Sequence, residues 1–277
     1  MDGTPPIDGI HPLIADISVT KITKSFASNG KMLLVLDSVS FEIMPGEFVA
    51  VVGPNGCGKS TLLKVIGGLI KPAEGNVLIK GRIPASAQRR NWISYVFQNP
   101  ALLPWRTVAE NVRLPLEIIH KGRIKESNRR SKELLGMMGL LEFGDYFPHQ
   151  LSGGMRQKVA VARALSFNPP ILLMDEPFSA VDEMTRDALN LYLLDLWDRL
   201  KFTVVYITHS VKEAVFLADK IVVLSERPAK VKKIFKIELP RPRTAEMRYS
   251  SAYAGLMKAV SASLRETAAL PMAAKRA

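Results

Sequence analysis

The order of apolar and polar residues along the first part of the chain predicts strands of two kinds. Residues 17–26 and 36–43 alternate between apolar and polar side chains, and a Pro45-Gly46 turn follows the second stretch. Such alternation is typical of antiparallel strands that bury one face and are joined by turns. Residues 48–52 are all apolar instead, which predicts a strand buried on both faces.

Strands and helices alternate along the rest of the chain. Leucines at helical spacing predict an amphipathic helix over residues 184–200, and another helix is expected at 60–67. This alternation is typical of an α/β fold with a mainly parallel sheet. We predict that an antiparallel β region precedes this sheet and that a helical insertion occupies about residues 100–155. The further strands are expected at residues 75–81, 171–174, 203–208 and 220–224.

Composition is that of an ordinary globular protein, but the charge is concentrated near one end. Apolar residues make up 47% and charged residues 23% of the 277 residues, which allows a well-buried core. The net charge is +12, and residues 226–277 hold 12 Lys and Arg against 4 Asp and Glu, hence +8 of it. A basic segment suits a solvated surface, a membrane face or nucleic acid. We expect no nucleic-acid partner, because no zinc spacing, RNA-binding aromatic motif or helix-turn-helix pattern accompanies it.

The start of the chain predicts neither secretion nor a membrane anchor. Residues 1–15 have no clear period and are expected to form a flexible leader, without the pattern of a secretory signal. No apolar run reaches the ~18 residues that a membrane span requires. The single cysteine, Cys57, excludes an intrachain disulfide and a Cys-cluster metal site. We therefore expect the protein in the cytoplasm.

The candidate chemistry begins with a glycine-rich loop between the apolar run and the first predicted helix. Its glycines let the backbone approach phosphate oxygens, and its N–H groups and the helix start form an anion nest. In this motif Lys59 reaches the β- and γ-phosphates, Ser60 ligates Mg²⁺ and Thr61 lies on the α-phosphate side. The strand–loop–helix context predicts a fold of the P-loop NTPase type that binds ATP and Mg²⁺. The loop consists of Gly53, Pro54, Asn55, Gly56, Cys57, Gly58, Lys59, Ser60 and Thr61.

Two acids, Asp175 and Glu176, follow the apolar run 171–174. Ligands of parallel sheets bind at the carboxyl ends of the strands, so we expect both side chains in the nucleotide crevice. Asp175 is then expected to hold Mg²⁺, directly or through water. Glu176 is expected to act as general base for the water that attacks the γ-phosphorus. The alternative is a merely solvated strand end.

Together with three later motifs, these residues resemble the ATP-binding-cassette (ABC) ATPases over about residues 17–225, in the family's order. The later motifs are Gln98, the segment LSGGMRQ at 151–157, and Ser179-Ala180-Val181-Asp182 with His209. The resemblance implies an ABC ATPase domain at residues 16–240, whose helical subdomain lies at about 100–155. Residues 241–277 then form a basic C-terminal extension, which we expect to be helical.

The resemblance assigns roles to three residues that carry little information alone. It implies that Phe26 stacks on adenine, where the family usually has Tyr. It implies that Gln98 reaches the metal or the attacking water and senses a transmembrane partner. His209 is expected to hydrogen-bond the γ-phosphate and help to place the water. Outside this context, Phe26 suits a core position, Gln98 a surface turn and His209 a structural role.

The LSGGMRQ segment predicts a second anion-binding turn. Ser152, Gly153 and Gly154 precede a helix that is expected to start near Met155, and N–H groups at a helix start attract anions. A Ser-Gly-Gly turn is by itself also an ordinary helix cap. In the family this turn closes over the γ-phosphate of the opposite subunit. One phosphate loop and one such turn per chain therefore predict a head-to-tail homodimer with two ATP molecules at its interface.

Two more residues belong to this expected interface by resemblance, Gln157 and Asp182. Val181 departs from the family's usual leucine by one methylene. Cys57 lies between two loop glycines, where the helix start and Lys59 are expected to lower the pKa of its thiol. We hypothesise that alkylation of Cys57 blocks ATP binding; the alternative is an unreactive loop residue.

Three stretches are similar to the ATPase subunits of nitrate, sulfonate and taurine importers: residues 99–108, 209–228 and 239–243. The apolar residues Leu102, Leu103 and Trp105 are expected to form an edge that receives a membrane subunit. The alternative for these three residues is local packing.

The resemblance implies a peripheral subunit at the cytoplasmic face of the bacterial inner membrane. Its partners would be integral-membrane permease subunits and, indirectly, a periplasmic or lipid-anchored solute-binding protein. The imported solute would be small and anionic or zwitterionic, such as an aliphatic sulfonate, taurine or nitrate.

Two other functions stay open. One is a cassette ATPase that acts on DNA or ribosomes, but such proteins often carry paired cassettes or long inserted arms. The other is a nucleotide-binding module without hydrolysis. The presence of Lys59, Asp175, Glu176 and His209 argues against this second function.

Overall fold

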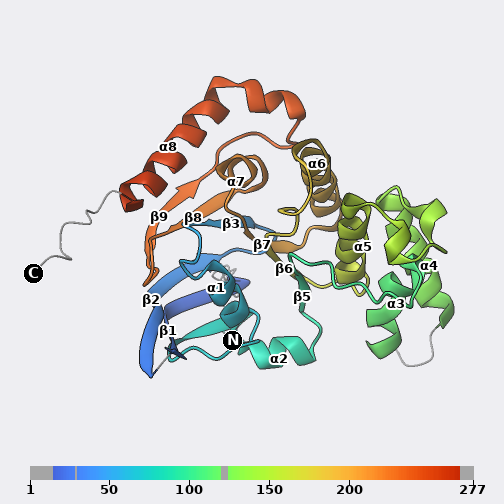
Figure 1. Ribbon diagram of the computed structural model, residues 1–277, viewed down its shortest axis with the longest axis horizontal. Helices are drawn as coiled ribbons and strands as arrows, with labels where there is room; N and C mark the ends of the chain where they lie inside the picture. Colours follow the sequence, from blue (N-terminus) through green and yellow to red (C-terminus); the bar gives the residue numbers. More distant parts are fainter. Residues whose placement is uncertain (1–14, 29, 120–123, 269–277) are drawn as a thin grey trace, which may run out of the picture.

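The structure is a computed structural model that describes residues 15–28, 30–119 and 124–268 (Figure 1). The leader predicted at 1–15 therefore lies outside the described residues except for Ala15. The end of the basic extension, residues 269–277, lies outside them as well. Within the described residues no helix is both long and apolar enough to cross a membrane.

A six-stranded sheet forms the centre of the molecule, in the order β5-β6-β7-β3-β8-β9. The strands from β5 to β8 run parallel, and β9 pairs antiparallel with β8 at the edge. The predicted mainly parallel sheet is confirmed. Its strands are β3 (Phe48–Val52), β5 (Ile93–Val96), β6 (Ile171–Asp175), β7 (Thr203–Ile207), β8 (Lys220–Leu224) and β9 (Val231–Lys236).

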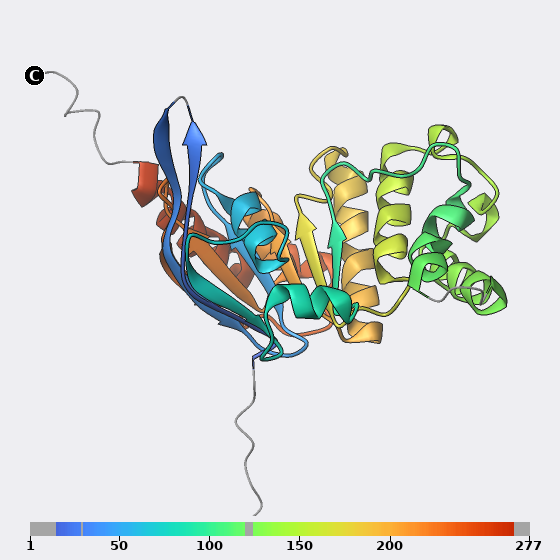
Figure 2. The same cartoon turned by 90° about the horizontal axis from the view of Figure 1, so that it is seen from below.

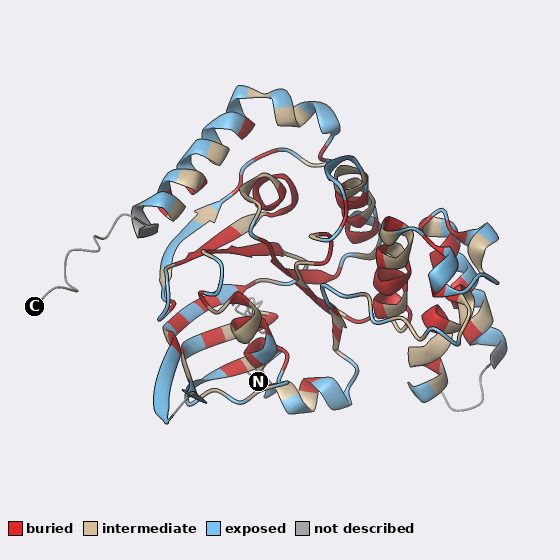
Figure 3. Cartoon of the chain, viewed as in Figure 1, coloured by how far each residue is buried: buried red, intermediate tan, exposed pale blue. Residues whose placement is uncertain are grey.

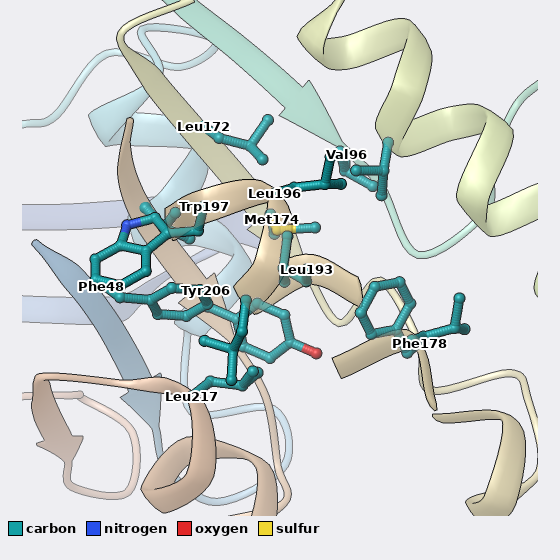
Figure 4. Packing of buried hydrophobic residues seen from close by; sticks show 14 of the residues in the cluster. Phe48, Val96, Leu172, Met174, Phe178, Leu193, Leu196, Trp197, Tyr206 and Leu217 are labelled. Carbon is teal, nitrogen blue, oxygen red and sulfur yellow. The ribbon is translucent and has the colours of Figure 1, made fainter. Parts of the chain in front are cut away.

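The inner strands of the large sheet, β3, β6, β7 and β8, are buried on both faces, as their continuous apolar runs predict. Along β3, Phe48 and Ala50 pack into one hydrophobic cluster, whereas Val49 and Val51 pack into another. The first cluster lies under the helices that cover one face, where Phe48 contacts Trp197 edge to face (Figures 3 and 4). The second cluster lies between the large sheet and a smaller one.

The smaller sheet is antiparallel and has three strands in the order β2-β1-β4, which confirms the predicted antiparallel region. Helix α1 contacts β2 on one side and β6 and β7 on the other, and so fills the space between the two sheets. Helix α2 packs on β4. These elements are β1 (Ile17–Ser28), β2 (Lys31–Ile43), β4 (Glu74–Ile79), α1 (Lys59–Ile66) and α2 (Pro84–Arg89).

A helical subdomain lies at the far end of the large sheet from the antiparallel one (Figure 2). It occupies the region of the predicted insertion, and its helices α3, α4 and α5 pack on one another. Helix α5 starts two residues earlier than predicted, because Ser152 caps it and Gly153 is its first residue. The elements are α3 (Val108–Ile119), α4 (Ile124–Met137), α5 (Gly153–Leu165) and the 3₁₀ turns η1 (Leu141–Phe143) and η2 (Pro148–Gln150).

The remaining helices cover the other face of the large sheet. Helix α6 packs on α5 and α7, and α7 packs on β3. The described part of the chain ends in η3 and the long helix α8, which crosses over α7, β8 and β9 (Figure 1). A helix thus occupies most of the described part of the extension, where the sequence predicts one. These elements are α6 (Glu183–Leu200), α7 (Val211–Leu217), η3 (Ala245–Tyr249) and α8 (Ser251–Ala268).

Candidate functional site

The phosphate loop connects the end of β3 to the start of α1. Its tight course requires glycine at residue 58, where φ is 125° and a Cβ atom would lie 2.8 Å from Val35 Cγ1. Lys59 is buried, and its Nζ donates to the carbonyl oxygens of Gly53 at 3.0 Å and Pro54 at 3.1 Å. The lysine cation is thus held at the loop by carbonyl groups of the loop itself.

A cavity of about 330 Å³ opens over this loop. It brings Phe26 and Glu176 together with the phosphate loop, as the sequence predicts. Arg227 also lines the cavity, although the motifs do not predict it at the site. The lining residues are Phe26, Val35, Asn55, Gly56, Gly58, Lys59, Ser60, Thr61, Glu176 and Arg227.

Phe26 is placed for a stacking role at one side of this cavity. The residue is 38% exposed, and its backbone is paired with Leu33 on the other strand of the hairpin. Lys24 Nζ lies 5.1 Å from the ring centroid. An exposed aromatic face beside a phosphate loop suits a nucleobase, because stacking buries both apolar faces.

Arg227 belongs to a turn between β8 and β9 that is firmly attached to β2. The N–H of Ala229 donates to Val35 O at 2.8 Å, and the N–H of Asp37 donates to Ala229 O at 3.0 Å. Lys230 and Asp37 form an ion pair of 3.0 Å beside this bridge. Arg227 itself is exposed and makes no ion pair or hydrogen bond with any described residue. Its free guanidinium therefore adds positive charge to the cavity wall.

Ser60 and Asp175 form the candidate metal site. The Ser60 hydroxyl donates to Asp175 Oδ1 at 2.9 Å, across the gap between α1 and the end of β6. Burial raises the pKa of the Asp175 carboxyl, the hydrogen bond from Ser60 lowers it, and the nearby Glu176 raises it further. A cation here would offset the desolvation of this carboxylate. Hydroxyl and carboxylate oxygens are the hard ligands that Mg²⁺ prefers, so the residues present fit this ion.

Glu176 and His209 meet at the carboxyl edge of the sheet. Glu176 Oε2 lies 2.9 Å from His209 Nδ1, and the N–H of Glu176 donates to Ile207 O at 3.0 Å. A carboxylate only accepts hydrogen bonds, so the proton of this contact belongs to Nδ1. Glu176 has φ 45°, a left-handed conformation that costs energy for a residue other than glycine. Such strain is frequent at functional sites.

Gln98 does not line the cavity but is hydrogen-bonded to α5, the helix that begins at the LSGGM turn. Its carbonyl oxygen accepts a hydrogen bond of 2.8 Å from Gln157 Nε2. The Gln157 side chain is buried, and its Oε1 has no partner among the described residues. The structure thus places Gln157 as a support of the Gln98 backbone. Direct contacts of Gln98 and Gln157 with metal or nucleotide stay predictions.

The LSGGM turn lies outside the cavity of its own chain. Ser152 Oγ accepts from the N–H of Met155 at 3.2 Å and thereby caps α5. A Cβ atom on Gly153 would lie 3.7 Å from Val181 Cγ1, whereas one on Gly154 would lie 2.6 Å from Thr185 Cγ2. Gly154 is thus required for the packing of α5 on α6, and Gly153 is not.

Asp182 caps α6 in the same way and is exposed. Its Oδ1 accepts from the N–H of Thr185 at 2.9 Å, and this hydrogen bond lowers the pKa of the Asp182 carboxyl. Asp182 does not line the cavity of its own chain either. Asp182 and Ser152 therefore remain available to a nucleotide bound elsewhere.

The expected low pKa of Cys57 was wrong. The thiol is buried, and burial raises the pKa of Cys57 more than the charge of Lys59 lowers it. Its sulfur faces the inside of the loop, because a Cβ atom on Gly53 would lie 2.9 Å from Cys57 Sγ. Cys57 thus belongs to the core between the sheets, and its thiol is a poor nucleophile in this structure.

The segment after Gln98 exposes an apolar surface. Trp105 is 71% exposed, whereas Leu102 and Leu103 are partly buried, with Leu102 packed against the core. Asn111 shapes this segment, since its side chain accepts from the N–H of Leu103 at 2.8 Å and donates to Leu103 O at 3.1 Å. A solvent-exposed tryptophan on a loop that hydrogen bonds hold in place is suited to contact another protein.

Comparisons with known proteins agree with this geometry. The family model described as ABC transporter matches residues 36–179. An uncharacterized ABC transporter ATP-binding protein of Methanocaldococcus jannaschii is 47% identical over 228 residues, 82% of this chain and 84% of that protein. The taurine import ATP-binding protein TauB of Rhizobium johnstonii is 42% identical, over 90% of this chain and 95% of that protein. The aliphatic sulfonates import ATP-binding protein SsuB of Bacillus cereus is 39% identical, over 82% and 88%.

A solved structure gives the same result for the fold. A dimeric ATP-binding cassette in a post-hydrolysis state, bound to ADP and Pi, matches with a TM-score of 0.72 and 35% identity. The match covers 81% of this chain and 100% of that one.

Proposed function

This chain belongs to the ABC transporter family, and we propose that its ATPase activity powers the import of a small anionic or zwitterionic solute. The observation that carries the proposal is the arrangement around one cavity. Ser60 and Glu176 both line it; the Ser60 hydroxyl lies 2.9 Å from Asp175 Oδ1, and Glu176 Oε2 lies 2.9 Å from His209 Nδ1. The 42% and 39% identity to taurine and aliphatic sulfonate import proteins supports sulfonates as the solute class. Nitrate stays an alternative solute.

In this proposal the phosphate chain of ATP replaces the internal contacts of the loop. Lys59 Nζ leaves the carbonyls of Gly53 and Pro54 and turns to the β- and γ-phosphates. Phe26 stacks on the adenine. Ser60 and Asp175 would hold Mg²⁺, which would supply charge neutralisation at the phosphates. These residues bind and orient the substrate, which is the main task in phosphoryl transfer.

Glu176 and His209 then act on the attacking water. Glu176 accepts a proton from the water while the water oxygen attacks the γ-phosphorus in line. ADP leaves on the opposite side of the phosphorus. His209 holds the carboxylate of Glu176 in place through Nδ1 and helps to position the water. The strained backbone of Glu176 suits this role, because strain is kept where it orients a reacting group.

We further propose a head-to-tail homodimer. Ser152, Gly153 and Asp182 do not line the cavity formed by their own chain. A second copy, turned around, would bring them to the γ-phosphate and supply the N–H groups of its α5 start. The dimeric state of the structurally similar cassette supports this arrangement.

Transport requires partners that this chain does not contain. Permease subunits would dock at the exposed Trp105, and the Gln98 segment beside it would link docking to the nucleotide site. An external solute-binding protein would deliver the solute to them. In this proposal the chain is a peripheral subunit at the cytoplasmic face of the cell membrane.

A growth experiment tests the proposed function. The gene is deleted and replaced by wild type or by Glu176→Gln, and cells grow with taurine or an alkanesulfonate as the sole sulfur source, or with nitrate as the sole nitrogen source. We expect wild type, but not the variant, to support growth on one of these solutes, with equal growth on sulfate and ammonium. Equal growth of the deletion strain on all these sources would reject the proposed solute class.

A further inference from the structure

The basic C-terminal extension makes close contacts with the helices that follow two of the proposed functional residues. Helix α6 begins one residue after Asp182, and α7 begins two residues after His209. The extension reaches both helices through η3 and α8. The charge pattern predicts a solvated or membrane-facing surface for its basic residues, but Arg241, Arg243 and Arg248 pack against the protein.

The first turns of α6 and α7 are joined by ion pairs. Lys212 Nζ lies 2.6 Å from Glu183 Oε1 and 3.4 Å from Asp187 Oδ2. Glu183 and Asp187 are one turn apart on α6, and Lys212 is the second residue of α7. This junction connects the starts of the two helices at the surface.

Arg248 of η3 completes the junction from outside. Its Nη1 lies 2.6 Å from Asp187 Oδ2, and only 11% of its side chain is exposed. Its guanidinium lies 4.0 Å above the ring centroid of Phe216, which belongs to α7. One side chain thus holds α6 by charge and α7 by a cation–π contact. Partly buried networks of this kind hold geometry better than single surface ion pairs.

Tyr253 of α8 adds a neutral contact to the same place. Its hydroxyl donates to the carbonyl oxygen of Lys212 at 2.9 Å, and its ring is buried. Ser250 fixes the start of α8, because its Oγ accepts from the N–H of Tyr253 at 3.2 Å. The extension therefore contacts both the side-chain network and the backbone at the start of α7.

A second connection lies inside the core. Arg186 donates to the carbonyl oxygens of Phe178 at 3.0 Å and Val181 at 2.8 Å, and so holds the loop before Asp182. Its Nε also lies 4.0 Å from Glu213 Oε1 of α7. The core thus sets the average position of the two helices, and the extension limits their movement from the solvent side.

We propose that the C-terminal extension positions His209 and Asp182 for ATP hydrolysis, with Arg248 and Tyr253 as its positioning residues. The inference rests on the proposed roles of His209 and Asp182. Hydrolysis needs the reacting groups held closely, so a looser junction would slow the chemical step. Nucleotide affinity would stay the same, because none of the described residues of the extension lines the cavity with the phosphate loop and Phe26.

The test compares variants of the full chain by kcat, KM for ATP, affinity for a fluorescent ATP analogue and Tm. Tyr253→Phe keeps the ring and removes only the hydroxyl; Arg248→Ala removes the cation, and Arg248→Lys restores its charge. Lys258→Ala is the matched control, because Lys258 is an exposed cation of α8 that forms no ion pair or hydrogen bond with the described residues of α6 and α7. We expect kcat to fall roughly fivefold for Tyr253→Phe and Arg248→Ala, as for one lost hydrogen bond. Affinity should not change, Arg248→Lys should recover part of kcat, and Lys258→Ala should match wild type.

Three results would overturn the inference. The first is an unchanged kcat in Tyr253→Phe and Arg248→Ala with a lower Tm, which would mean that the extension only stabilises the fold. The second is that Arg248→Ala lowers kcat by the same factor in the His209→Ala protein as in wild type, since the effects of residues that act through one another are not additive. The third concerns His209 itself. If His209→Ala leaves kcat unchanged, the proposed role of His209 fails and the inference fails with it. If His209→Ala lowers kcat and the extension variants do not, only the inference fails.

Discussion

Glu176 and His209 are 33 residues apart in the chain, yet Glu176 Oε2 and His209 Nδ1 lie 2.9 Å apart. The reason is the pairing of β6 with β7, which places Asp175 opposite Ile207 and so brings both strand ends to one edge. Each side chain follows its strand by one or two residues. The left-handed backbone of Glu176, with φ 45°, turns its carboxylate toward the histidine. The proposed general base therefore has a fixed orientation.

Replacing this base should separate binding from turnover. In Glu176→Gln the amide keeps the size of the side chain but cannot take a proton from water. We expect kcat to fall by about 100-fold or more, with unchanged ATP affinity and a dimer that persists in ATP. Phosphate release and size-exclusion chromatography measure the two effects.

The control for this experiment is Glu142→Gln. Glu142 is an exposed carboxylate of the helical subdomain, and its replacement should leave hydrolysis unchanged. Normal turnover by a monomeric Glu176→Gln protein at saturating ATP would contradict the role of Glu176.

Replacing Asp175 by asparagine should raise the stability of the fold at neutral pH but abolish ATP hydrolysis. Burial raises its pKa in the folded protein above the unfolded value, so its ionised form is disfavoured by folding. The contribution of the Asp175 side chain to stability is therefore fully present below the pKa that this carboxyl has in the unfolded chain, near pH ~4. It is lost as the pH rises through the higher pKa of the folded protein. Asp175→Asn should then raise Tm at pH 7 in buffer without Mg²⁺, and the difference should vanish toward pH ~4.

The same variant should lose hydrolysis, because an amide is a poor ligand for Mg²⁺. Thermal unfolding from pH 4 to pH 8, with and without Mg²⁺ and ATP, measures the two effects. A Tm of Asp175→Asn below that of wild type at pH 7 without Mg²⁺ would show that the carboxylate stabilises the fold.

Mixing two inactive variants should restore activity if the site is shared between copies. Lys59→Ala disables the phosphate loop of one copy, and Gly153→Asp places a negative charge at the LSGGM turn of the other. The aspartate fits its own chain, since a Cβ atom at Gly153 has room and an acid suits a helix start. A mixed dimer contains one site with both defects and one site with none.

We expect each variant alone to be inactive and an equimolar mixture to regain roughly a quarter of wild-type turnover, because half of the dimers are mixed and each has one good site. The control is a mixture of Lys59→Ala with a Lys59→Ala, Gly153→Asp double variant, which leaves no intact site. Failure of the first mixture to recover, with dimers present, would exclude a nucleotide site between copies.

The parts of the fold that follow local patterns could be predicted from the sequence. β3 is a continuous apolar run and the phosphate loop is one local backbone motif, so both are where the sequence predicts them. β5 was missed because it has four residues and includes the polar Ser94. β9 was missed because its lysines lie on an exposed edge strand, where charge blocks unwanted strand pairing.

Long-range contacts limited the prediction of the site. The place of Arg227 depends on the pairing of Ala229 with β2, nearly 200 residues earlier in the chain. The pKa of Cys57 depends on burial between two sheets, which the loop motif does not reveal. The conformation of a local motif such as the phosphate loop can be predicted from sequence. The residues that pack around the motif from distant parts of the chain cannot.

Docking of a membrane subunit should depend on Trp105. Its side chain is 71% exposed and lies on the loop after Gln98, so Trp105→Ala removes a large apolar contact without disturbing the core. We expect hydrolysis stimulated by the permease to fall by about tenfold, as for the loss of an interface anchor, and basal hydrolysis to stay unchanged. Tyr249→Ala is the matched control, because Tyr249 is an exposed aromatic residue on η3, far along the chain from this loop. Equal losses of basal and stimulated hydrolysis in Trp105→Ala would remove the docking role.

Arg227 should contribute to nucleotide affinity through charge. It is a cation without a described partner on the wall of the cavity, and the Ala229 bridge holds its turn beside β2. We expect Arg227→Ala to weaken ATP and ADP binding about fivefold, and less at high salt, whereas Arg227→Lys keeps most of the affinity. Arg89→Ala, an exposed cation on α2, is the control. If the arginine acts on phosphate, GTP affinity falls by the same factor and adenosine affinity does not change. A loss confined to adenine nucleotides and shared by adenosine would place Arg227 at the base instead.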